Sequence, residues 1–144
     1  MVQAIGFYTR RLVDTPTALN FQQWFEENNI PNSLPLNQLH CSVITAEAEI
    51  PGYRPDRFPV LIRPKQFSIK ILNAALVVAF DSPMLKRSWL QAVATGIGLK
   101  YPTFLGHVSV SYAVPIDFDV MEVKPPTFPI RLLPEESAPV TSFS

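Results

Sequence analysis

Residues Asp14 to Ser42 read DTPTALNFQQWFEENNIPNSLPLNQLHCS, and residues Asp81 to Ser109 repeat the outline of this segment as DSPMLKRSWLQAVATGIGLKYPTFLGHVS. Each segment opens on an aspartate, a hydroxyl residue and a proline, and each ends on a histidine with a serine two positions later. These markers are separated by 67 positions throughout, with no net insertion. Similarity at a fixed offset is typical of a duplicated unit. The two copies predict two lobes related by a pseudo-twofold axis.

Both copies begin with signals for the start of a helix. Asp14 or Thr15 is a suitable N-cap in the first copy, and Asp81 or Ser82 is one in the second. A proline in the first helical turn loses no hydrogen bond through its missing N–H. We therefore expect a helix from Pro16 to about Asn28 and a second helix from Pro83 to a stop at Gly96. The side chains expected to form the buried stripe of the second helix are Leu85, Trp89, Leu90 and Val93.

The remaining pattern is mostly that of strands and loops. The expected strands are residues 4–13, 39–46, 66–72, 75–80, 105–112 and 128–133. The proline-rich residues 47–64 are expected to form a long irregular loop, and the polar tail 136–144 is expected to be mobile. The sequence thus predicts a single α+β domain over residues 1–144. Its lobes cover about 1–72 and 73–135, with antiparallel sheets that line a central cleft.

The histidine strands carry the candidate chemistry. Side chains two positions apart on a strand share a face, so His40 lies with Ser42 and His107 lies with Ser109. Cys41 is expected on the opposite, core-facing side, where a thiol is a poor nucleophile. A pseudo-twofold axis would bring both His–Ser pairs to one cleft. That arrangement predicts a symmetric acid–base site.

Paired imidazoles suit a reaction at phosphorus. The ordinary histidine pKa is near 6.5, so one ring can be neutral and accept a proton while the other is charged and donates one. The serine hydroxyls can donate to phosphate oxygens as negative charge grows in the transition state. Two histidines without a third ligand make a poor zinc site, so we expect no metal.

Composition narrows the class of protein. The formal net charge of the 144 residues is +0, which argues against an electrostatic grip on long DNA or RNA. One cysteine cannot form an internal disulfide, and the N-terminus lacks the order of a signal peptide. No apolar run reaches the length of a membrane span. We expect a soluble, cytoplasmic protein.

The motifs His40-Cys41-Ser42 and His107-Val108-Ser109 resemble the H-x-[ST] motifs of the two-histidine (2H) phosphoesterase superfamily, over essentially the whole chain. Within it, NNIPNSLPLNQLHCSVITA and FLGHVSVSY are most similar to the phage anti-CBASS phosphodiesterases (anti-CBASS protein 1). The resemblance implies a LigT-like fold. It also implies a cyclic di- or trinucleotide immune signal as substrate, in the cytoplasm of the host cell.

The resemblance further implies roles for the four motif residues. His40 and His107 become general base and general acid, in either order, while Ser42 and Ser109 bind phosphate. A ribose 2′-OH attacks a 3′–5′ linkage, and no metal or other cofactor takes part. The family usually has threonine in at least one of the two serine positions. Serine keeps the hydroxyl donor but loses the β-branch that restricts χ1, which predicts weaker preorganisation.

Five further residues are candidates for substrate binding. Tyr8 on the first strand can stack on a base, with core filling as the alternative. Arg54 and Arg57 lie in a locally basic loop that suits a small dianion, with solvation as the alternative. Glu135 and Glu136 follow the last expected strand, and the resemblance suggests a glutamate near the nucleobase.

Two other functions remain open at this point. One is an RNA 2′,3′-cyclic phosphodiesterase from the same superfamily, which would need a cleft that follows RNA. The other is a non-catalytic protein that sequesters cyclic nucleotides, which would need donors but not a matched pair of proton-transfer groups. A structural protein would leave the repeated histidine spacing unexplained.

Overall fold

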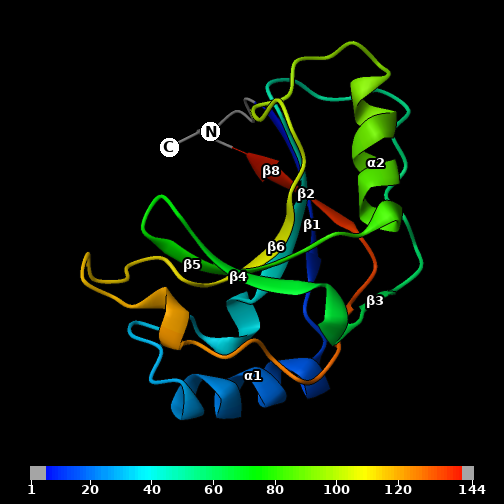
Figure 1. Ribbon diagram of the computed structural model, residues 1–144. Helices are drawn as coiled ribbons and strands as arrows, with labels where there is room; N and C mark the ends of the chain where they lie inside the picture. Colours follow the sequence, from blue (N-terminus) through cyan, green and yellow to red (C-terminus); the bar gives the residue numbers. More distant parts are fainter. Residues whose placement is uncertain (1–5, 141–144) are drawn as a thin grey trace.

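A computed structural model of the protein describes residues 6–140 and contains two three-stranded antiparallel sheets (Figure 1). The strand orders are β8–β1–β2 and β4–β5–β6, and a separate pair is formed by β3 and β7. The elements are β1 Gly6–Leu12, α1 Thr15–Glu27, β2 His40–Ala46, β3 Val60–Ile62, β4 Phe67–Leu72, β5 Ala75–Phe80, α2 Pro83–Val93, β6 Gly106–Ser111, β7 Ile130–Leu132 and β8 Glu136–Val140.

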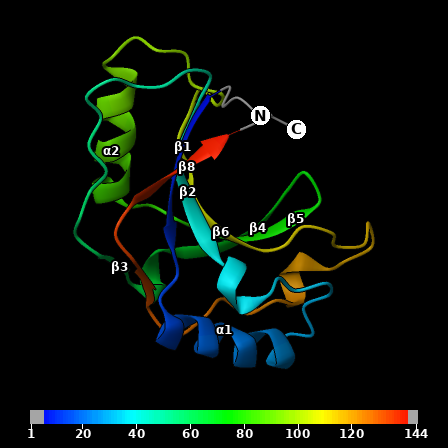
Figure 2. The same cartoon turned by 180° about the vertical axis from the view of Figure 1, so that it is seen from behind.

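The predicted α+β fold of two related lobes is confirmed. Each lobe has a central strand, a helix and a histidine strand in the same chain order, as β1–α1–β2 and as β5–α2–β6. In each sheet the histidine strand is the outer neighbour of the central strand. The two histidine strands, β2 and β6, lie side by side where the sheets meet (Figures 1 and 2). The repeat in the sequence is therefore a repeat in space.

The helices begin where their capping signals predict. The Asp14 side chain accepts a hydrogen bond from the Thr17 N–H at 3.0 Å, and the Ser82 hydroxyl accepts one from the Leu85 N–H at 3.4 Å. Each cap satisfies a backbone donor that the first turn leaves without a helical partner. The prolines follow the caps in both helices. No helix among residues 6–140 is long and apolar enough to cross a membrane.

The sheets divide the chain differently from the predicted lobe boundary between residues 72 and 73. Strand β4 pairs with β5 and therefore belongs to the second sheet. The reason is local: Asn73 and Ala74 both have positive φ, at 49° and 68°, as a tight two-residue hairpin turn requires. Such a turn forces the strands on either side of it to pair.

The predicted mobile tail is also corrected, because Glu136–Val140 forms β8 and pairs with β1. Its Pro139 is tolerated because β8 is an edge strand. Part of the expected loop 47–64 is likewise a strand, since Val60–Ile62 pairs with Ile130–Leu132 of the predicted last strand. Residues 141–144 of the predicted tail lie outside the described residues.

The core lies between the sheets and the helices. The buried face of α2 differs from the predicted one. Leu85 is fully buried, but Leu90 and Val93 are 49% and 42% exposed. The other buried α2 residues are the small Ser88 and Ala92. Helix α2 packs against β2 of the first sheet, and small side chains allow this close approach. The buried stripe is therefore rotated from the one that hydrophobicity alone predicts.

Candidate active site

The two histidines are held in the same way, each at the start of its strand. His40 Nδ1 is 2.7 Å from the Gln38 carbonyl oxygen, and His107 Nδ1 is 2.8 Å from the Leu105 carbonyl oxygen. Both rings are half-buried, and both bond to the residue two positions earlier. The duplicated sequence thus produces a duplicated hydrogen bond.

These hydrogen bonds define which ring nitrogen is available for chemistry. A carbonyl oxygen only accepts, so Nδ1 of each ring must carry the donated proton. Nε2 is then a proton acceptor when the ring is neutral and a proton donor when the ring is charged. Both histidines consequently present the same atom, Nε2, for proton transfer. That is the requirement for a pair that exchanges acid and base roles.

A cavity of about 380 Å³, here called the central cavity, joins the two lobes. Ser42 of β2 and His107 of β6 both line it. His40 and Ser109 are half-buried on the strand faces that also carry Ser42 and His107. The full lining is Ser42, Val43, Thr45, Leu72, Asn73, Trp89, Tyr101, Pro102, Thr103, Phe104, Leu105 and His107.

The surroundings of His40 favour its neutral form. Burial lowers the pKa of His40 below 6.5, the hydrogen bond with Gln38 opposes this shift, and the positive charges of Arg10 and His107 lower the pKa further. His107 is near enough to be one of these causes because its strand, β6, packs beside β2. A neutral imidazole is the form that accepts a proton.

Tyr8 lies beside the first serine. Its hydroxyl is 2.9 Å from the Ser42 hydroxyl, and the register of β1 with β2 places Tyr8 opposite Thr45 on the cleft face. Burial raises the pKa of Tyr8, so the phenol stays protonated at neutral pH. Ser109 has no such partner among the residues that the structure describes. Tyr8 therefore lies at Ser42, on the same face of the sheet, and is not among the residues that line the central cavity.

Arg10 is a residue that the sequence analysis missed. It lies directly opposite Ser42 in the β1–β2 register, and its Nε donates to Glu136 Oε1 of β8 at 3.0 Å. The available signal was alternation, since Arg10 is two positions after Tyr8 on the same strand. Glu136, one of the predicted residues, is therefore the ion-pair partner of Arg10, and it lies in the same cross-strand row as Arg10 and Ser42.

Glu135 is placed elsewhere. Its side chain is buried at 6% exposure, where it accepts hydrogen bonds from the Tyr53 hydroxyl at 2.6 Å and from the Asp56 N–H at 3.0 Å. The fully buried Arg11 donates to Asp56 Oδ2 at 2.8 Å in the same network. Successive side chains of an extended segment point to opposite sides, so Glu135 and Glu136 cannot both reach the cleft. Through these hydrogen bonds, Glu135 instead links the C-terminal segment to the loop that contains Tyr53 and Asp56.

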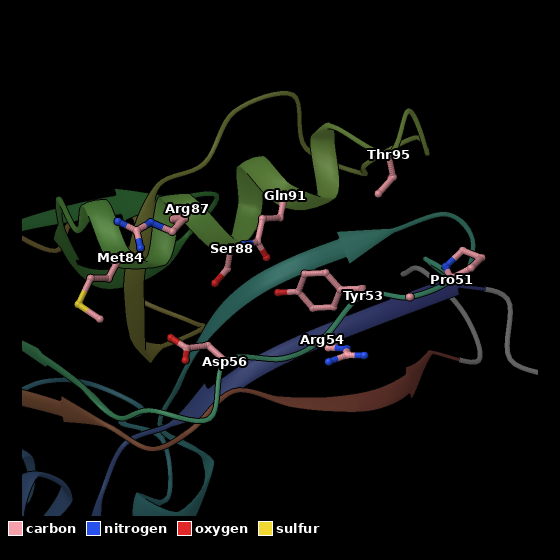
Figure 3. Close-up of a pocket in the computed structure, with 10 residues that line it drawn as sticks. Pro51, Tyr53, Arg54, Asp56, Met84, Arg87, Ser88, Gln91 and Thr95 are labelled. Atoms are coloured by element: carbon pink, nitrogen blue, oxygen red, sulfur yellow. The ribbon is translucent and has the colours of Figure 1, made fainter.

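The two predicted arginines do not line the central cavity. Arg54 lies at a separate cavity of about 540 Å³ between the loop 51–56 and α2, which shares no lining residue with the central one. In Figure 3 the Arg54 side chain lies on the side of this loop that faces away from α2. Arg57 is exposed and lines neither cavity. Neither arginine of the basic loop is therefore placed at the central cavity.

The sequence analysis also missed the aromatic wall of the central cavity. Trp89 of α2 and Phe104 pack with ring centroids 6.3 Å apart, and the 56% exposed Tyr101 lies on the same wall. The stretch KYPTFLGH carried this signal, since it leads directly into the second histidine strand. Planar, partly exposed rings are suited to stack on a nucleobase.

Cys41 takes no part in this site. The residue is fully buried, and burial raises the pKa of its thiol to about 12. The predicted core-facing orientation is confirmed. Among residues 6–140, no group of three or more His, Cys, Asp or Glu side chains is arranged to hold a metal ion.

Two solved structures share this fold. A crystal structure titled as a phosphoesterase matches with a TM-score of 0.60, and the E. coli LigT complexed with 3'-AMP matches with a TM-score of 0.61. Both are 10% identical in sequence, and each match covers 97% of this chain and 100% of the other. The fold is therefore that of the LigT-like two-histidine phosphoesterases, and the paired His-x-Ser strands occupy its two lobes.

Within this class, the family model described as Anti-CBASS protein Acb1 matches residues 5–142. The chain belongs to this family of anti-CBASS proteins. The matched range contains both His-x-Ser motifs and the aromatic wall, so it covers the whole candidate site. The resemblance drawn from the two motifs is confirmed.

Proposed function

We propose that this protein is a phosphodiesterase that opens cyclic di- or trinucleotide signals and so blocks CBASS defence. The observation that carries the proposal is the matched pair of histidines, both with Nδ1 bonded to a carbonyl oxygen and with no hydrogen bond to Nε2 from residues 6–140. Membership of the anti-CBASS family supports the biological role. A protein that only sequesters nucleotides has no need of two rings held in one tautomer.

In the first step, the ribose 2′-oxygen attacks the phosphorus of a 3′–5′ linkage. His40 Nε2 takes the proton of the 2′-OH as the new bond between the 2′-oxygen and phosphorus forms. His107 Nε2–H donates a proton to the 5′-oxygen as the bond between that oxygen and phosphorus breaks. The ring becomes a linear chain that ends in a 2′,3′-cyclic phosphate. The lowered pKa of His40 favours it as the base in this step.

In the second step the roles exchange. His107, now neutral, takes a proton from water as the water oxygen bonds to phosphorus. His40, now charged, donates its proton to the departing ribose oxygen, and both rings return to their starting states. Positioned acids and bases of this kind each contribute about 10²–10⁴-fold in rate. No external reactant other than water is consumed.

The serines and Tyr8 would stabilise the charge on phosphate. Ser42 and Ser109 lie two residues after the histidines, on the same strand faces, and can donate to the two non-bridging oxygens. The Tyr8 hydroxyl at 2.9 Å holds the Ser42 hydroxyl in place. The aromatic wall of Trp89 and Tyr101 would receive a base of the bound nucleotide.

The direct test is incubation of the purified protein with EDTA and a panel of cyclic di- and trinucleotides, followed by mass spectrometry. Linear products that pass through a 2′,3′-cyclic phosphate are expected. Rings that remain intact but bound would instead indicate a sequestering protein. Intact, unbound rings together with cleavage of RNA ends would indicate the RNA 2′,3′-cyclic phosphodiesterase.

A second test addresses the nucleophile. A ring that lacks the attacking 2′-OH is expected to bind and to resist cleavage, because the internal nucleophile is missing. Efficient hydrolysis of this deoxy ring would show that water attacks the diester directly, and the two-step reaction above would then be wrong.

A further inference from the structure

A third cavity, of about 290 Å³ and here called the outer cavity, adjoins the central one. The two cavities share Phe104 and Leu105 as lining residues, so a ligand that fills the central cavity can extend past this wall. The full lining of the outer cavity is Gln66, Ser68, Lys70, Ala79, Phe80, Asp81, Ser82, Lys86, Phe104, Leu105 and Gly106. Nothing in the reaction proposed above uses Ser68 or Lys70.

The register of the second sheet places these two residues on the face that carries the catalytic motif. Ser109 lies opposite Val77, and Val77 lies opposite Lys70. His107 lies opposite Ala79, and Ala79 lies opposite Ser68 in the same way. Cross-strand partners in an antiparallel sheet share a face. Because β4 is two strands from β6, Lys70 lies about 10 Å from the motif, with the buried Val77 and Ala79 of β5 between them.

The positive charge of Lys70, on the edge strand β4, has no acidic partner among the residues that the structure describes. In the first lobe the equivalent cross-strand row runs from Ser42 through Arg10 to Glu136. There the Glu136 carboxylate forms an ion pair with Arg10 at 3.0 Å. In the second lobe, no acidic side chain among the described residues forms an ion pair with the exposed Lys70. Lys86 and Asp81 also line the outer cavity, which leaves it with an excess of one positive charge.

We propose that Lys70, with Ser68, binds a second phosphate of the cyclic substrate while the first is cleaved at the histidines. This inference rests on the proposed function, since it concerns the same bound ring. A cyclic dinucleotide carries a phosphate on the far side of the ring from the one under attack. A lysine ammonium is a compact point charge of the kind that suits a phosphate, and the Ser68 hydroxyl adds a donor. The site thereby selects substrates with more than one phosphate.

The test compares ligands that differ in phosphate number. The first is a cyclic dinucleotide without 2′-OH groups, and the second is a linear deoxydinucleoside monophosphate, which has a single phosphate; neither can be cleaved by 2′-OH attack. Lys70→Met is expected to weaken binding of the ring about tenfold, as for loss of a charge-assisted hydrogen bond, and to change binding of the one-phosphate ligand less than about twofold. Isothermal titration calorimetry measures both affinities.

Matched controls separate the subsite from general electrostatics. Lys65 is exposed in the turn that precedes β4 and lines neither cavity, so Lys65→Met should leave both affinities unchanged. Lys70→Arg keeps the charge and should retain most of the affinity for the ring. An equal loss for both ligands in Lys70→Met, or an unchanged affinity for the ring, would overturn the proposal.

Failure of this inference can be distinguished from failure of the proposed function, because the first is measured by binding and the second by turnover. Selective binding that depends on Lys70, without hydrolysis of the ribose ring by the unmodified protein, would reject the phosphodiesterase and retain the subsite. Hydrolysis of the ribose ring with no contribution from Lys70 to binding would do the reverse.

Discussion

The two lobes place the same His-x-Ser motif on equivalent strands, but the neighbouring strand differs between them. In the first lobe Ser42 lies opposite Arg10 and contacts the Tyr8 hydroxyl. In the second lobe Ser109 lies opposite Val77, and the position equivalent to Tyr8 is Ala75. The duplicated backbone therefore holds the two candidate proton-transfer residues in the same way, whereas the residues beside the two motifs differ.

The largest expected effect is loss of either histidine. His40→Ala and His107→Ala should each lower kcat by about 10²–10⁴-fold, because each removes a positioned proton-transfer group. The double variant should be little slower than the slower single variant, since the pair acts as a unit. Single-turnover rates on a cyclic dinucleotide measure these effects.

The same two variants should separate the roles of the lobes. If His40 is the base of the first step, His40→Ala removes the acidic limb of the kcat/KM profile, whereas His107→Ala removes the basic limb. Circular dichroism and thermal melts should stay unchanged, because both rings are half-buried at the cleft. Loss of the same limb in both variants would contradict the division of roles.

Loss of either serine hydroxyl should have the next largest effect, and loss of the Tyr8 hydroxyl beside Ser42 a smaller one. Ser42→Ala and Ser109→Ala are each expected to reduce kcat by about 10²–10³-fold, as for other donors to a developing charge. Tyr8→Phe removes only the hydrogen bond to Ser42 and should cost about 2–10-fold.

A double-mutant cycle tests this link between Tyr8 and Ser42. Tyr8→Phe should have no further effect in the Ser42→Ala background, because its partner is already absent, and its full effect in the Ser109→Ala background. Equal effects in both backgrounds would show that Tyr8 acts by another route, such as stacking on a base.

Local signals account for what the sequence predicted well. The caps at Asp14 and Ser82 lie within three residues of the N–H groups they bind, and alternation along one strand places His40 with Ser42. Such features depend on neighbours in the chain, so they can be read without knowledge of the fold.

Long-range pairing accounts for what was missed. The burial of Glu135 depends on Tyr53, which is 82 residues away in the sequence. The strand character of Glu136–Val140 depends on the free edge of β1, and Pro139 argued locally against a strand. Without those partners, nothing in the sequence distinguishes the buried Glu135 from the half-exposed Glu136.

The pH dependence of kcat/KM tests the effect of Arg10, which lies opposite Ser42 in the first lobe, where the second lobe has Val77 opposite Ser109. Burial, and then the positive charge of Arg10, lowers the pKa of His40, and a general base loses activity as pH falls through its pKa. The acidic limb should therefore have its midpoint below 6.5, the ordinary histidine value. Arg10→Met removes one cation, so the midpoint should move to higher pH. Steady-state kcat/KM between pH 4 and 8, roughly the range around a histidine pKa, measures the shift.

Two matched variants control this prediction. Glu136→Gln removes the partner of Arg10 and leaves its charge less screened, so the midpoint should move to lower pH. Arg57→Met removes an exposed cation outside the central cavity and should leave the limb in place. A midpoint that moves equally in Arg10→Met and Arg57→Met would reflect net charge alone.

The smallest expected effect concerns the missing β-branch. Ser109 has no hydrogen-bond partner among the described residues, whereas the Ser42 hydroxyl is already held by Tyr8. Ser109→Thr restricts χ1, and a saving of about 0.5 kcal/mol in side-chain entropy corresponds to an increase of about twofold in kcat. Ser42→Thr should change kcat less, because its rotamer is fixed. An increase in kcat for Ser42→Thr alone would contradict this prediction. It would show that the Ser109 hydroxyl, with Val77 opposite, is already oriented without help from a tyrosine.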